Sequence, residues 1–153
     1  MNKTKIRIIL IILIIAFILS SCLKERKISI NDVKQKDIIN TAINQLGKKY
    51  CYGGKGPLCF DCSGFVYYVY KKNGYNIPAT TKGLKNFGEK IKRIKKMKPA
   101  DIIIFKIKRK HYHTGIYIGD NRFIHSPSKG GKIRIEAMNK YWQKKFKYAR
   151  RIL

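Results

Sequence analysis

The sequence predicts an α+β fold in which N-terminal helices pack on a central antiparallel β-sheet of about five to six strands. Two observations predict this fold. Apolar residues recur at helical spacing between residues 36 and 73, whereas the second half of the chain carries short apolar runs separated by turn residues. Because the helices come first and sequential strands follow, the order differs from the strand–helix alternation of a parallel α/β sheet.

The helices are predicted from periodicity and from their end signals. The first covers residues 36–46, with Gly47 placed to end it and an aspartate upstream available as a cap. Five Gly or Pro residues in 47–61 predict loop or extended chain there. A second helix is expected over 61–73 and a short one over 81–87.

The strands begin with the unbroken apolar run 102–107, which predicts a strand that is buried on both faces. Shorter apolar segments follow, and a helical turn is expected near the C-terminus. The expected strands cover 113–118, 122–126, 132–136 and 147–152, and the expected turn covers 141–146.

The N-terminus is typical of an export signal. A basic start precedes an apolar run from Ile8 to Leu19, which is too short to span the roughly 30 Å hydrocarbon core of a bilayer. The sequence Leu19-Ser20-Ser21-Cys22 resembles a bacterial lipobox, which implies cleavage before Cys22 and lipid attachment to its sulfur. An ordinary signal peptide beside a coincidental cysteine is the alternative.

Three regions follow from this organisation. Residues 1–21 are expected to be a lipoprotein signal peptide, and residues 22–35 the lipidated N-terminus and a polar tether. Residues 36–153 are expected to form one catalytic domain, a usual size for a single core.

The charge is strongly positive. The chain has 35 Lys plus Arg against 8 Asp plus Glu, a formal net charge of +27, and loss of the three basic leader residues leaves +24. Such a surface attracts polyanions such as nucleic acid, anionic lipid or an acidic wall polymer. Because the lysines are scattered over nearly every segment, charge alone identifies no partner, and the export signal argues against a nucleic acid.

The chemistry centres on Cys62, at the predicted start of the second helix. Free amides and the helix dipole stabilise a thiolate at such a position. The chain has only three histidines that could serve as its base, His111, His113 and His125, and all lie in the strand-forming half. A nucleophile on a helix and a base on a facing strand form the general cysteine–histidine arrangement.

Five segments carry a resemblance to a known family. In order, they are Tyr50-Cys51-Tyr52-Gly53-Gly54, Phe60-Asp61-Cys62-Ser63-Gly64, Pro99-Ala100-Asp101-Ile102-Ile103-Ile104-Phe105, His113-Thr114-Gly115-Ile116-Tyr117-Ile118-Gly119 and Phe123-Ile124-His125. In order and spacing they resemble the NlpC-type cell-wall cysteine endopeptidases, which are papain-like enzymes. The sequence departs from that family at Pro78-Ala79-Thr80-Thr81, where many relatives have an arginine after the proline, and at Ala100, which replaces a common glycine.

The resemblance implies roles for individual residues. Cys62 is the nucleophile, His113 the general base and His125 the group that orients it, while Tyr52 is a polar contact near the nucleophile. His111 is expected at the rim. Two further candidates for oxyanion or substrate contacts flank the nucleophile, Asp61 and Ser63, although a helix-capping role is favoured for both.

The other two cysteines, Cys51 and Cys59, flank the glycine-rich loop. In an exported protein they can form a disulfide, and two free thiols are the main alternative. A Cys59–Cys62 disulfide would block the nucleophile. Because no βαβ pattern surrounds Cys59-x-x-Cys62, a thioredoxin-like role is disfavoured, and so is zinc binding.

A geometric condition applies to the two histidines. Successive side chains along a strand point to opposite faces of the sheet. His113 and His125 therefore share a face only if His125 pairs with a residue that lies an even number of positions from His113. A simple two-residue loop at Asp120-Asn121 would separate them. We therefore predict an odd-numbered loop over residues 119–121 or a bulge elsewhere in the pair.

Together these features predict a monomeric, lipid-anchored peptidoglycan endopeptidase of the cell envelope that needs no metal or cofactor. The resemblance implies hydrolysis of a D-glutamyl– or D-alanyl–diaminopimelate bond in stem peptides or cross-links through an acyl-enzyme. An outer-membrane anchor would apply in a Gram-negative host and the outer face of the plasma membrane otherwise. An acyl-transfer enzyme of the same fold acting on another amide or lipid, and a catalytically silent envelope-binding lipoprotein, are the alternatives.

Overall fold

The computed structural model describes residues 30–129 and 131–153. The expected signal peptide, the lipidation candidate Cys22 and most of the expected tether lie outside these residues. Within the described ranges, no helix has both the length and the apolar character required to cross a bilayer.

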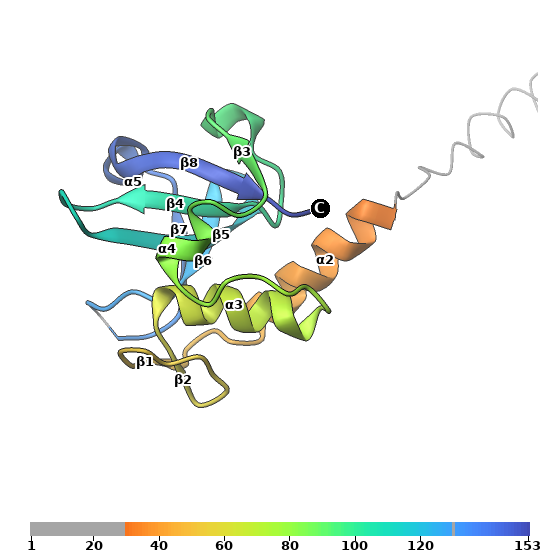
Figure 1. Cartoon of the computed structure of the whole chain (residues 1–153), viewed down its shortest axis with the longest axis vertical. Coiled ribbons are helices and arrows are strands. Elements are labelled where there is room, and N and C mark those ends of the chain that lie inside the picture. Colours follow the sequence, from red (N-terminus) through yellow and green to blue (C-terminus); the bar gives the residue numbers. More distant parts are fainter. Residues whose placement is uncertain (1–29, 130) are drawn as a thin grey trace, which may run out of the picture.

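The described chain contains helices, a small two-stranded sheet and a larger sheet (Figure 1). The helical elements are α2 (Ile30–Ile43), α3 (Cys62–Lys72), α4 (Thr81–Leu84), the 3-10 turn η1 (Ile94–Lys96) and α5 (Lys140–Lys145). The strands are β1 (Lys49–Tyr50), β2 (Cys59–Phe60), β3 (Glu89–Ile91), β4 (Ile102–Lys106), β5 (Tyr112–Gly119), β6 (Arg122–His125), β7 (Arg134–Ala137) and β8 (Phe146–Arg151).

The larger sheet has six strands in the order β3-β8-β4-β5-β6-β7, and every neighbouring pair is antiparallel. The α+β prediction with five to six strands is therefore confirmed. Strand β3 was not expected, because the segment 89–91 is short and carries only one buried residue. Strands β1 and β2 pair separately, in parallel.

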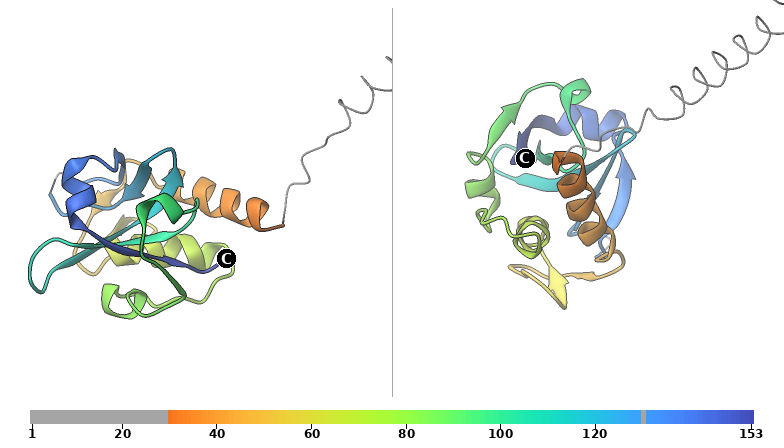
Figure 2. Two further views of the ribbon diagram at one scale, coloured as in Figure 1. Left: turned by 90° about the horizontal axis from the view of Figure 1, so that it is seen from above. Right: turned by 90° about the vertical axis from the view of Figure 1, so that its right-hand side faces the viewer.

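Strand β4 lies at the centre and is buried on both faces, as its apolar run predicts. On one face, Ile102 and Ile104 pack in a core with residues of α2 and α3. On the other, Ile103 and Phe105 pack in a second core with Trp142 of α5. Figure 2 shows α3 and α5 on opposite sides of the sheet.

Two local features differ from simple expectation. Helix α2 begins at Ile30, so its first turns occupy residues that were expected to be tether. Ala100, in place of the glycine common in the resembling family, has a φ of 69°, in the left-handed region that favours glycine. Its carbonyl accepts a hydrogen bond from the buried Tyr70 hydroxyl, which fixes this turn.

The β5–β6 connection satisfies the parity condition through a bulge. Asp120 and Asn121 form a two-residue turn, and both have positive φ, 48° and 55°, as in the type I′ turns of hairpins. Gly119 pairs with Arg122, but the register shifts so that Tyr117 pairs with Phe123. The residue inserted at this shift restores the parity that places His113 and His125 on one face.

Candidate active site

Cys62 is the first residue of α3, as predicted. The preceding Asp61 is the N-cap, and its Oδ1 accepts hydrogen bonds from the Gly64 backbone N–H at 2.6 Å and from the Ser63 hydroxyl at 3.0 Å. Ser63 is buried. Both flanking side chains therefore stabilise the start of the helix, which agrees with the favoured capping role.

The glycine-rich loop supports this helix start. The sulfurs of Cys51 and Cys59 lie 1.99 Å apart, at bonding distance, and Cys62 is a free cysteine. The Gly54 carbonyl accepts a hydrogen bond from the Asp61 backbone N–H at 2.8 Å. The disulfide-closed loop thus contacts the backbone that presents Cys62.

The Cys62 thiol lies against the start of β5. Burial raises the pKa of the thiol, while the Thr81 hydroxyl and the backbone N–H groups of Thr114 and Ser63 lower it in part. The sulfur lies 3.9 Å from Thr81 Oγ1. Among the described residues, no hydrogen bond joins the thiol to His113, the neighbour of Thr114. Such bonds are often long without substrate.

His113 and His125 are brought together. His113 Nε2 lies 2.7 Å from His125 Nδ1, and the His125 side chain is completely buried. Burial and the charge of His125 lower the pKa of His113 to about 3, and burial lowers the pKa of His125 to about 4. Both rings are therefore neutral at pH 7. His111 lies exposed in the β4–β5 connection.

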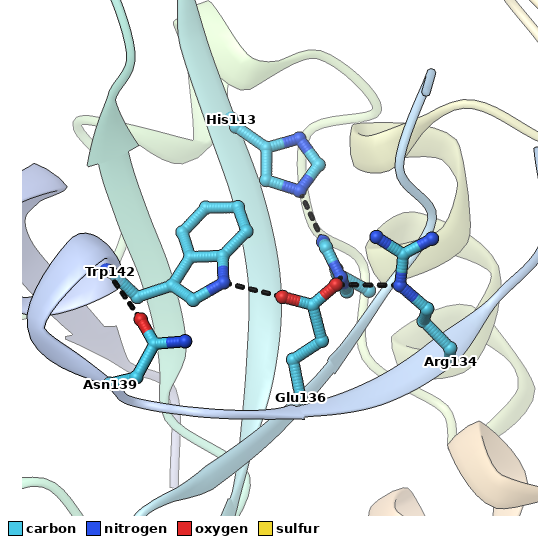
Figure 3. A network of polar contacts seen from close by, with 6 residues as sticks. His113, Arg134, Glu136, Asn139 and Trp142 are labelled. Atoms are coloured by element: carbon cyan, nitrogen blue, oxygen red, sulfur yellow. Dashed lines mark hydrogen bonds and ion pairs between the residues drawn. The ribbon is translucent and has the colours of Figure 1, made fainter. Parts of the chain in front are cut away.

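Behind the histidines lies a group of residues that the sequence did not single out. Glu136 of β7 approaches His125, and it contacts Arg134 and the indole of Trp142 (Figure 3). Trp142 packs against both histidines, with ring centroids 5.8 Å from His113 and 5.3 Å from His125. No motif marks these residues, because they reach the site only through the pairing of β6 with β7 and the placement of α5.

The side chain of Tyr52 is exposed to solvent. The chain turns at Tyr52 and Gly53 after β1 ends, which leaves the tyrosine side chain 96% exposed. Tyr50 is partly buried instead, and burial, followed by the charges of Cys62 and Asp61, raises the pKa of its phenol. Tyr50 belongs to the same sequence segment, but spacing alone did not separate the two tyrosines.

Comparison with known proteins identifies relatives of this chain. The model of the NlpC/P60 family matches residues 47–151. The murein DD-endopeptidase MepS/murein LD-carboxypeptidase of Escherichia coli K12 is 34% identical over 124 residues, which cover 80% of this chain and 64% of the relative. The γ-D-glutamyl-L-lysine dipeptidyl-peptidase of Bacillus subtilis is 37% identical over 103 residues, 65% of this chain and 34% of the relative. The chain thus matches less than two thirds of either relative.

Solved structures give the same result. The crystal structure of an NlpC/P60 family protein from Bacillus cereus superposes with a TM-score of 0.71 at 30% identity, covering 76% of this chain and 39% of that one. The NlpC/p60 domain of the peptidoglycan hydrolase SagA superposes with a TM-score of 0.67 at 28% identity, covering 77% and 98%. With a family model that spans most of the described domain, the chain belongs to the NlpC/P60 family.

Proposed function

We propose that this protein is a cysteine peptidase that hydrolyses an amide bond in the stem peptides or cross-links of peptidoglycan. The observation that carries the proposal is the placement of a free thiol, Cys62, at a helix start beside β5, whose His113 contacts His125 of β6. The relatives add support. One is named as a murein endopeptidase and carboxypeptidase, and another as a γ-D-glutamyl-L-lysine dipeptidyl-peptidase.

The proposed reaction uses the ring nitrogen of His113 that His125 does not occupy. Cys62 sulfur attacks the carbonyl carbon while its proton passes to His113 Nδ1. The backbone N–H of Cys62, at the unpaired start of α3, and the Tyr50 hydroxyl stabilise the oxyanion. His113 then returns the proton to the leaving amine nitrogen as the C–N bond breaks. Water, deprotonated by His113, hydrolyses the thioester and regenerates the thiol.

The family and the names of the relatives indicate bonds beside a diamino acid. A D-glutamyl or a D-alanyl bond to diaminopimelate is the substrate that we propose. The positive charge of the chain suits a polyanionic wall, although it is not specific to one. We further propose that the mature chain is a monomer, begins at a lipidated Cys22 and acts at the cell envelope.

The test is a muropeptide digest. Purified peptidoglycan is incubated with the wild-type protein or with Cys62→Ala, and the soluble fragments are identified by mass spectrometry. We expect new stem-peptide fragments with the wild type and none with Cys62→Ala, while both proteins unfold at the same temperature. Intact wall together with release of a fatty acid or another amine would favour the acyl-transfer alternative. Wall binding without hydrolysis, and with no alkylation of Cys62, would favour the silent lipoprotein.

A further inference from the structure

Three side chains lie on three consecutive strands, and Figure 3 labels the outer two, His113 and Glu136. His113 of β5 contacts His125 of β6 at 2.7 Å, and His125 Nε2 lies 3.4 Å from Glu136 Oε1 of β7. The His125 Nε2 atom is buried and has no hydrogen-bond partner among the described residues, so this 3.4 Å approach is an ion-pair distance. The carboxylate is therefore the group that this nitrogen faces.

Glu136 is held in position by two donors. Arg134 Nε donates to its Oε1 at 2.6 Å, and the Trp142 indole N–H donates to its Oε2. Trp142 is itself positioned by Asn139, whose side chain caps α5 and accepts from the Trp142 backbone N–H at 3.2 Å. Burial alone would raise the pKa of Glu136. The pKa nevertheless lies below its ordinary value, because Arg134 and Trp142 donate hydrogen bonds to the carboxylate and His125 adds a favourable charge. Glu136 is ionised at neutral pH.

The arrangement matters because a neutral imidazole carries only one ring proton. The base His113 must keep Nδ1 free to take the thiol proton, so its own proton sits on Nε2 and is donated to His125 Nδ1. The single proton of His125 must then sit on Nε2, where it faces an anion. The opposite tautomer of His125 would donate to His113 Nε2 and push the His113 proton onto Nδ1.

We propose that Glu136 is a positioning residue that selects the Nε2–H tautomer of His125 and, through it, keeps Nδ1 of His113 free to accept the Cys62 proton. The inference rests on the proposed function. No proton moves to Glu136. When His113 becomes an imidazolium, the Glu136 carboxylate stabilises the added charge through the intervening ring. Arg134, which shares the same carboxylate oxygen, opposes this stabilisation.

The test compares Glu136→Gln with Glu89→Gln. Both variants remove one negative charge, but Glu89 is exposed on β3, at the opposite edge of the sheet from β7. Two readouts need no wall substrate: the histidine tautomers by ¹⁵N NMR, and the rate at which iodoacetamide alkylates Cys62 across pH 5–8. Hydrolysis of muropeptides is the third.

In the wild type and in Glu89→Gln we expect both histidines as Nε2–H tautomers. In Glu136→Gln we expect a mixture of His125 tautomers, about tenfold slower alkylation near pH 6, which corresponds to one pKa unit, and a similar loss of kcat/KM. A merely structural role for Glu136 would lower the melting temperature and leave the tautomers and the shape of the pH profile unchanged. That outcome would overturn the proposal.

A second variant tests the same idea in the opposite direction. Arg134→Gln removes the competing cation but keeps an amide N–H that can donate to Glu136, so alkylation near pH 6 should become severalfold faster than in the wild type. An unchanged or slower rate would contradict the proposed role, and this holds even if Glu136→Gln fails to fold. Failure of the peptidase function would instead appear as a wild-type protein that leaves peptidoglycan intact while its tautomers still depend on Glu136.

Discussion

At the scale of single residues, the protonation state of Cys62 is the main departure from the sequence-based expectation. Its position at the start of α3 predicts a lowered pKa, yet burial outweighs the helix N-terminus and raises the pKa of the thiol. The resting residue is therefore a thiol at neutral pH. In the proposed reaction the thiol depends on a nearby base at the moment of attack, so the neutral state of His113 is part of that proposal.

Thr81 is the side chain that we expect to adjust this thiol. Its hydroxyl lies 3.9 Å from the Cys62 sulfur and favours the thiolate. Thr81→Val keeps the shape but removes the hydroxyl, so iodoacetamide should alkylate Cys62 severalfold more slowly at pH 7. Thr81→Ser is the matched control and should alkylate at nearly the wild-type rate. Equal rates for Thr81→Val and the wild type would show that the hydroxyl does not act on the thiol.

At the scale of elements, the start of α3 is fixed by its close approach to the disulfide-closed loop. A Cβ on Gly64 would lie 1.9 Å from the Gly54 carbonyl oxygen, a backbone atom that cannot turn aside. The same loop contains Cys51 and Cys59 and accepts a hydrogen bond from Asp61 through Gly54. The family motif around Cys62 therefore describes a helix and a loop that fit together, in addition to the proposed nucleophile.

This contact predicts the effect of Gly64→Ala. In an unobstructed helix the change would stabilise by about 1 kcal/mol through helix propensity. Here the added methyl group must separate α3 from the loop, and we expect the free energy of unfolding in urea to fall by about 3 kcal/mol. Gly74→Ala is the control: it has open space but a φ of 82°, and should cost only about 1–2 kcal/mol. A smaller loss for Gly64→Ala than for Gly74→Ala would contradict the close approach.

At the scale of the whole molecule, the two enclosed histidines couple stability to pH. In the folded state the pKa is about 3 for His113 and about 4 for His125, against about 6.5 in the unfolded chain. Above pH 6.5 neither the folded nor the unfolded state binds these protons, so the two histidines do not lower the free energy of unfolding there. Below pH 6.5 the unfolded chain binds protons that the folded protein does not, and stability falls as the pH decreases toward 4.

We therefore expect the free energy of unfolding to decrease between pH 7 and pH 5, with each histidine contributing at most about 1.4 kcal/mol per pH unit. Urea unfolding at half-unit intervals measures the slope. His125→Asn should remove about half of it, because one of the two titrating groups is lost. The same substitution at the exposed His111 is the control. A slope that His125→Asn does not change would contradict the assignment.

The sequence alone determined the α+β class, the double burial of β4, the place of Cys62 and the parity that His113 and His125 need. These features follow from local periodicity, from turn residues and from a motif that is continuous in the chain. The sequence left two ways to meet the parity condition, an odd-numbered loop over residues 119–121 or a bulge elsewhere in the strand pair. It could not choose between them, because the same residues fit a two-residue turn and a longer loop.

Only the tertiary structure decided which side chains surround the two histidines and the thiol. Glu136 reaches His125 because β7 pairs with β6, and Trp142 reaches both rings because α5 packs on that face. Thr81 of α4 approaches Cys62 of α3 although 19 positions separate them in the sequence, and the chain leaves β1 with Tyr50 partly buried and Tyr52 exposed. Each of these contacts depends on register and packing between distant segments, which a local sequence pattern does not encode.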